Sequence, residues 1–116
     1  MTPLYIAAEF GHEAVVRALI EAGADVNKAR DDGWTPLFAA AQNGHEAVVQ
    51  ALIQAGADVN KVNEDGATPL FIAAQEGHGA VVRSLIQAGV DVNEAMDDGV
   101  MPLFIAAQKG HEAVVR

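Results

Sequence analysis

Cysteine is absent from the 116-residue chain, and this absence excludes disulfide bonds and thiolate chemistry. Aromatic residues make up only 5% of the sequence, so alanine, valine, leucine and isoleucine must supply the core. No apolar run approaches the roughly 20 residues that span a bilayer, and the first residues do not resemble a signal peptide. These features allow an intracellular location, which we expect, and leave the compartment open.

Basic residues are also few, because seven Lys and Arg stand against sixteen Asp and Glu, a net charge of −9. Binding to nucleic acid depends mainly on Lys and Arg that neutralise phosphates, and anionic membrane surfaces also attract basic segments. We therefore expect neither nucleic acid nor a membrane as partner. A partner with basic residues fits this charge, although the acidic excess also serves solubility alone.

Hydroxyl side chains that could act as nucleophiles are scarce. The hydroxyl residues are Thr2, Thr35, Thr68, Ser84 and Tyr5. The threonines stand at helix-capping positions, and the serine lies inside a predicted helix. No nucleophile elbow, phosphate-binding glycine loop or dinucleotide-binding motif occurs. We predict no enzymatic activity and no cofactor.

The sequence repeats itself every 33 residues. Thr-Pro-Leu begins at residues 2, 35 and 68, and Met-Pro-Leu at residue 101. Gly-His and Asp-Val-Asn return at the same period, and residues 34–66 share 22 of 33 aligned positions with residues 67–99. A fixed period of this length indicates a repeat architecture. We predict one domain over residues 1–116, with repeats of about 1–33, 34–66, 67–99 and 100–116.

Each repeat predicts two short helices and a turn. Thr35 is a good N-cap, Pro36 suits the first helical position, and Gly44 can end the first helix in a left-handed conformation. The second helix is expected from about Glu46 to Gln54, with one apolar face made of Val48, Val49, Leu52 and Ile53. The following segment, up to residue 66, is expected to be an extended arm with a tight turn. Because neither helix can bury its face alone, neighbouring repeats must stack into a solenoid.

These motifs resemble the ankyrin repeat family along the whole chain. The family pattern is roughly D-x-x-G-x-T-P-L-H-x-A-A-x-x-G-H, a Val- and Leu-rich helix, then G-A-D-V-N, and residues 33–60 follow it closely. The resemblance implies an all-α solenoid of helix-turn-helix repeats with β-turn fingers.

Two departures from the family pattern recur in the chain. The histidine after Thr-Pro-Leu, which helps to hydrogen-bond the turn in the family, is replaced by an aromatic residue at Tyr5, Phe38, Phe71 and Phe104. We expect aromatic packing to serve instead. The aspartate that usually opens the unit is replaced at Arg30, Asn63 and Met96, so the hydrogen bonding of the turn is in doubt.

Ankyrin-like proteins hold partners in a groove formed by the turn tips and the first helices. The resemblance places the groove here at Glu9, Phe10, Asp31, Asp32, Trp34, Gln42, Asn43, Glu64, Asp65, Ala67, Gln75, Glu76, Asp97, Asp98, Val100, Gln108 and Lys109. Trp34 differs most from its counterparts, which are Ala67 and Val100. An exposed Trp beside two Asp is typical of a binding hot spot; alternatively, its ring packs against a neighbouring turn.

Histidines and acidic pairs recur without predicting a metal site. The histidines, at His12, His45, His78 and His111, take equivalent places in repeats that stacking separates by roughly 8–10 Å. Two nitrogens on one zinc ion must lie much closer than that. Each histidine is expected to start the second helix and to bond local backbone groups. The acidic pairs lack the spacing of a calcium loop, and they indicate either simple turn preference or an acidic recognition edge.

The leading hypothesis is therefore a protein–protein interaction module. Its rival is an architectural spacer within a longer array, which the near identity of the repeats favours. The first and last repeats are incomplete and lack polar caps, so we expect a fragment of a longer array and end-to-end self-association.

A separate hypothesis concerns modification. A leucine stands eight residues before Asn27, Asn60 and Asn93, which looks like the pattern that asparaginyl hydroxylases accept in ankyrin repeats. The alternative is that asparagine simply suits this turn.

Overall fold

The computed structural model describes residues 1–89, and this part of the chain contains six helices. They are α1 (Pro3–Glu9), α2 (Glu13–Glu21), α3 (Pro36–Gln42), α4 (Glu46–Gln54), α5 (Pro69–Gln75) and α6 (Gly79–Gln87). The predicted site residues that lie outside the described residues are Asn93, Asp97, Asp98, Val100, Gln108, Lys109 and His111.

The first helix of each repeat begins as the sequence predicts, with proline following an extended threonine. The Thr2 hydroxyl accepts a hydrogen bond from the Tyr5 amide at 3.1 Å, and Thr68 accepts one from Phe71 at the same distance. Thr35 holds the equivalent position, but its side chain makes no capping hydrogen bond. The prediction of a capping position is confirmed there, whereas the expected side-chain bond is wrong.

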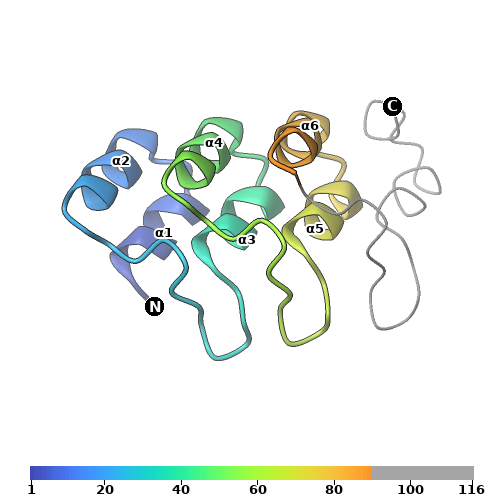
Figure 1. Ribbon diagram of the computed structural model, residues 1–116, viewed down its shortest axis with the longest axis horizontal. Coiled ribbons are helices and arrows are strands. Elements are labelled where there is room, and N and C mark those ends of the chain that lie inside the picture. The colour runs from blue at the N-terminus through green and yellow to red at the C-terminus, as the bar shows by residue number, and fades with distance from the viewer. Residues whose placement is uncertain (90–116) are drawn as a thin grey trace.

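The helices form two rows, with α1, α3 and α5 in one and α2, α4 and α6 in the other (Figure 1). Helices of one row contact each other between successive repeats, and the two helices of a repeat contact each other across the rows. The connections after α2 and α4 project as fingers from the row of α1, α3 and α5. They are named here the first finger (residues 28–35) and the second finger (residues 61–68). The stacked solenoid is confirmed over the described residues.

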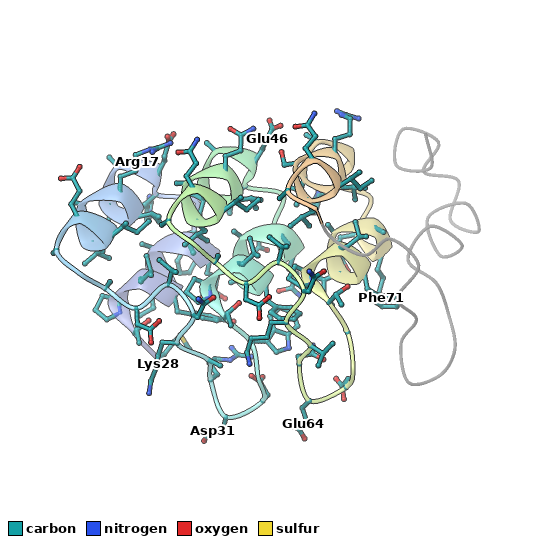
Figure 2. All side chains as sticks on the ribbon, viewed as in Figure 1. Arg17, Lys28, Asp31, Glu46, Glu64 and Phe71 are labelled. Atoms are coloured by element: carbon teal, nitrogen blue, oxygen red, sulfur yellow. The ribbon has the colours of Figure 1, made fainter. Side chains whose placement is uncertain are left out.

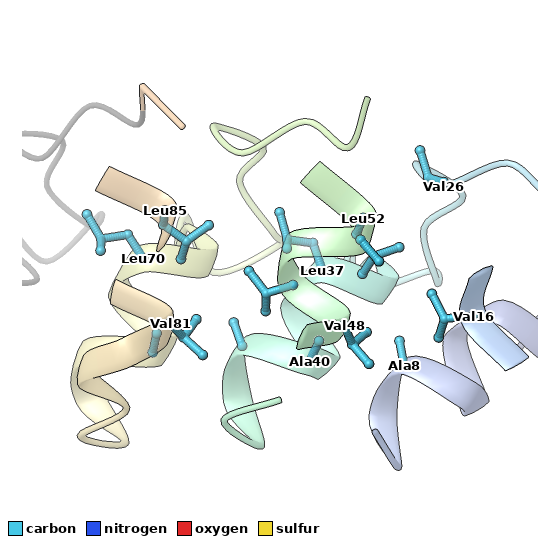
Figure 3. Close-up of a cluster of buried hydrophobic side chains, with 14 of the residues drawn as sticks. Ala8, Val16, Val26, Leu37, Ala40, Val48, Leu52, Leu70, Val81 and Leu85 are labelled. Carbon is cyan, nitrogen blue, oxygen red and sulfur yellow. The ribbon is translucent and has the colours of Figure 1, made fainter. Parts of the chain in front are cut away.

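One continuous apolar cluster lies between the two rows and draws on all six described helices (Figure 3). Val48, Val49 and Leu52 on α4 are at most 1% exposed, so the predicted apolar face does point inward. Ile53 is only partly buried at the edge of the cluster. The main cluster therefore joins neighbouring repeats as well as the two helices within each one.

A second cluster occupies the base of the fingers. It consists of Phe38, Ala67, Phe71 and Ile72, with Trp34 packed against it. Phe38 and Phe71 stand where the family pattern has histidine, and their exposed fractions are 0% and 4%. The expected aromatic packing is therefore present at these positions. None of the described helices is long and apolar enough to cross a membrane.

Candidate partner-binding surface

Both described fingers close with the same pair of backbone hydrogen bonds. The Arg30 amide donates to the Trp34 carbonyl at 2.8 Å, and the Asn63 amide donates to the Ala67 carbonyl at 2.9 Å. The glycine inside each finger then donates back to the first residue of its pair, to Arg30 at 2.9 Å and to Asn63 at 3.0 Å. The extended arms with tight turns that the sequence predicts are therefore present.

Different side chains stabilise the two turns. In the second finger, Asn63 Oδ1 accepts hydrogen bonds from the amides of Asp65 at 2.9 Å and Ala67 at 3.0 Å. In the first finger Arg30 cannot accept, and Asp32 Oδ1 instead accepts from the Trp34 amide at 3.1 Å. Side-chain hydrogen bonds therefore stabilise both turns, although neither turn has the aspartate of the family pattern.

The acidic residues of the fingertips are not equivalent. Asp31, Glu64 and Asp65 are exposed, and Figure 2 shows Asp31 and Glu64 at the tips, on the side away from the helices. Asp32 is half-buried, and its carboxylate accepts from Arg30 Nε at 3.2 Å and from a second guanidinium nitrogen. The Arg30 guanidinium lowers the pKa of Asp32 below its usual range. Of the two candidate carboxylates in the first finger, Asp32 is therefore already paired within the chain, whereas Asp31 is exposed.

Trp34 is neither fully exposed nor fully buried. Its ring centre lies 5.4 Å from that of Phe38, and the ring packs against the cluster that contains Ala67 of the second finger. The alternative interpretation, packing of the ring against a neighbouring finger, therefore describes the contacts of Trp34. Ala67 itself, predicted to line the groove, is 2% exposed and belongs to the core.

The remaining predicted groove residues of the described chain stand at the C-terminal ends of the first helices. They comprise half-buried Glu9 and Gln75 and exposed Phe10, Gln42, Asn43 and Glu76. Phe10 is the most prominent of them, with 63% of its surface exposed. Asn43 also has a structural role, because its side-chain nitrogen Nδ2 donates to the Glu9 carbonyl at 3.1 Å and so ties one repeat to the preceding one.

Two of the described histidines, His45 and His78, connect neighbouring repeats, which the sequence does not reveal. His45 Nε2 lies 3.0 Å from the Glu9 carbonyl oxygen, and His78 Nε2 lies 2.8 Å from that of Gln42. A carbonyl only accepts, so Nε2 carries the proton. The expectation that these histidines bond local backbone groups is wrong, because each acceptor lies in the preceding repeat. Within residues 1–89, no three His, Asp or Glu side chains lie close enough together to hold a metal ion.

Asn27 also links repeats. Its side-chain nitrogen donates to the Gly56 carbonyl at 3.3 Å, and its Oδ1 accepts from the Asp58 amide at 2.8 Å. Asn60 takes the equivalent place one repeat later, and both residues are exposed. This bonding gives the recurring asparagine a structural purpose, while its exposure leaves the modification hypothesis standing as a proposal.

A family model described as ankyrin repeats (three copies) matches residues 1–63 and 55–116. The chain belongs to the ankyrin repeat family. Ankyrin repeats are in general modules for protein–protein interaction. The chain matches none of the curated proteins.

Proposed function

We propose that this ankyrin array binds a protein partner with basic residues across its fingertips and the C-terminal ends of its first helices. The observation that carries the proposal is the placement of Asp31, Glu64 and Asp65, which are exposed at the tips of adjacent fingers. No ion pair within residues 1–89 involves these three carboxylates. The net charge of −9 extends the same attraction to longer range.

Adjacent fingers are held in register, so the carboxylates form a continuous edge. The Glu64 amide donates a hydrogen bond of 2.8 Å to the Asp32 carbonyl, which joins the second finger directly to the first. Because the backbones are fixed to each other, a partner meets a preorganised surface and loses less affinity to the ordering of loops.

Apolar contact area is present at the C-terminal end of α1. Phe10 is 63% exposed at the end of α1, and a large aromatic side chain of this kind supplies much of the binding energy at interfaces. Acidic fingertips and an exposed ring on the same array suit a peptide that carries both basic and apolar side chains.

Binding of a lysine-rich peptide to charge-reversal variants tests this proposal. Asp31→Lys and Glu64→Lys, each made alone, should weaken binding about fivefold or more, since an attractive contact becomes repulsive. Glu46→Lys is the matched control, because Glu46 is exposed at the start of α4 on the side opposite the fingers (Figure 2). Affinity of the original protein should also fall as salt rises, since exposed charges are screened beyond about 8 Å at physiological ionic strength.

Two outcomes contradict the proposal. Equal losses of affinity in the finger variants and in Glu46→Lys would show that only the net charge determines binding. An affinity that does not change with salt would show that the acidic edge does not contribute to binding. A complete lack of binding to basic peptides would favour the alternative function, an architectural spacer within a longer array.

A second candidate function, self-association, rests on the outer face of α1 and α2. Ile6 and Val15 are 44% and 49% exposed, whereas their counterparts one repeat later, Ala39 and Val48, are 2% and 1% exposed. The preceding repeat covers the later pair, so the same kind of surface on the first repeat is shaped to receive a repeat. We propose that a second copy of the chain supplies it; the other half of an end-to-end contact lies outside the described residues.

Light scattering over a concentration series tests this self-association. The average mass of the unsubstituted protein should rise with concentration, whereas Val15→Glu should keep the mass of a monomer. Arg17→Glu, an exposed substitution on the same helix, is the control for added acidic charge. A mass that never rises, or one that rises equally in all three proteins, would exclude this face.

A further inference from the structure

Three residues that break the repeat pattern meet at the base of the first finger. Tyr5 stands where the later repeats have phenylalanine, Arg30 where they have asparagine or methionine, and Trp34 where they have alanine or valine. The three positions are spread over 30 residues of sequence, yet the stacking of the repeats brings their side chains together. The scaffold requires none of these three residue types, since the other repeats manage without them.

Arg30 is the centre of this group. Its guanidinium carbon lies 5.0 Å from the ring centre of Tyr5 and 5.7 Å from that of Trp34, both within the range of cation–π attraction. The guanidinium also donates two hydrogen bonds to the carboxylate of Asp32. Asp32 is fixed in turn by the Trp34 amide, which donates to it at 3.1 Å. Two aromatic rings and one oriented carboxylate thus surround a single guanidinium.

This arrangement selects a guanidinium over an ammonium. A carboxylate that accepts two parallel N–H bonds matches the planar fork of arginine, and the flat group also stacks on aromatic rings. Lysine carries a compact, strongly hydrated charge that gains less from either contact.

The Arg30–Asp32 side of the group is accessible to a partner, whereas the Tyr5 ring beneath Arg30 is 3% exposed. The side chains of Arg30 and Asp32 are 34% and 39% exposed, and exposed ion pairs of this kind hold together weakly. A surface recess of about 540 Å³ adjoins the pair. Its lining consists of Met1, Lys28, Ala29, Arg30, Asp31 and Asp32. The recess offers room for an incoming side chain and for a displaced Arg30.

We propose that Tyr5, Trp34 and Asp32 form a guanidinium-binding box that Arg30 fills in the free protein and that an arginine of the partner takes over on binding. This inference rests on the proposed binding of basic partners and deepens it, because it names arginine as the residue recognised. Arg30 then competes with the partner, and it keeps the box formed while no partner is bound.

Trp34 makes the box directly measurable, because it is the only tryptophan in the chain. The probes are short blocked peptides of equal charge that alternate glycine with either arginine or lysine. The arginine peptide should bind more tightly than the lysine peptide, and it should change the Trp34 fluorescence, which the lysine peptide should leave nearly constant.

Substitution of the competing residue gives the sharper test. Arg30→Met introduces the residue type that position 96 already carries, and it should raise the affinity for the arginine peptide about fivefold or more, since an exposed ion pair and two cation–π contacts no longer compete. Lys28→Met removes the same charge from the same recess without emptying the box, and its effect should stay within about twofold to threefold. Adding Asp32→Asn to Arg30→Met should return the affinity to the level of Lys28→Met.

The outcomes separate this inference from the proposed function. If both peptides bind the original protein equally and Trp34 fluorescence stays constant, basic partners are bound but the box is not used. If Arg30→Met gains no more than Lys28→Met, the box is overturned whether or not the original protein binds either peptide. Circular dichroism of each variant verifies that the helices remain.

Discussion

Gly11→Ala offers the clearest test of how one repeat is locked onto the next. Gly11 has a φ of +74°, and a Cβ built there would lie 2.6 Å from Nδ1 and 2.7 Å from Cε1 of the His45 ring. The same ring makes the 3.0 Å hydrogen bond from Nε2 to the Glu9 carbonyl. Any residue larger than glycine must therefore displace the histidine and disturb that bond. Gly23 is the matched control, since its φ is +94° and its Cβ would meet nothing within 4 Å.

The magnitudes follow from these two environments. Holding alanine in a left-handed conformation costs about 1–2 kcal/mol at either site. At Gly11 the displaced ring adds about 1–3 kcal/mol of overpacking strain, and the disturbed hydrogen bond adds about 1 kcal/mol. We therefore expect Gly11→Ala to lower the free energy of unfolding by about 2–4 kcal/mol more than Gly23→Ala does.

Urea denaturation on two backgrounds measures the effect. In His45→Ala the ring is gone, so adding Gly11→Ala should cost only the backbone term, about 1–2 kcal/mol. The difference between the two backgrounds is the coupling energy of the pair. Equal costs with and without the histidine would refute the reasoning, because they would show that the ring and the glycine turn do not meet.

Other predictions concern the core, the ion pair and the recurring asparagine. Leu52→Ala should lower the free energy of unfolding by about 2–5 kcal/mol, because Leu52 is completely buried. Gln54→Ala, at an exposed position, should lower it by less than about 0.5 kcal/mol. Equal costs in denaturant titrations would show that the buried face of α4 has been assigned wrongly. Because Arg30 lowers the pKa of Asp32, their pairing stabilises the fold fully at pH values above 3.8, the ordinary pKa of the carboxyl group. This stability is lost as the pH falls through the lower pKa of the folded state. Arg30→Met should therefore raise the pKa of Asp32 in an NMR titration, and an unchanged value would show that the pair does not persist in solution. Asparaginyl hydroxylase should add oxygen at Asn27, seen as an increase in intact mass, and no increase would dismiss that modification.

The helices and their buried faces could be predicted because local chemistry fixes them. A proline after threonine and a glycine able to take positive φ mark the ends of the first helix, and the second helix spans Glu46–Gln54 as expected. The spacing of Val48 and Leu52 then allows only one buried face, since these side chains project from the same side of a helix.

The contacts between repeats could not be predicted, because they depend on the register in which the units stack. His45 reaches a carbonyl 36 positions earlier in the sequence, and Arg30 contacts a ring 25 positions earlier. Neither distance follows from the helical period. The unusual identity of Trp34 was visible in the sequence, but its half-buried state depends on Phe38 and on the adjacent finger.

The hydrogen bonds between repeats have a consequence for how such a protein can change its sequence. Their acceptors are main-chain carbonyls, at Glu9 and Gln42 for the two histidines and at Gly56 for Asn27. A carbonyl is present whichever residue occupies the position, so the side chains at 9 and 42 can mutate without removing an acceptor from a junction. Those same side chains stand on the surface proposed to meet the partner. The array can therefore acquire a new binding preference by point mutation while its repeats stay joined by the same hydrogen bonds.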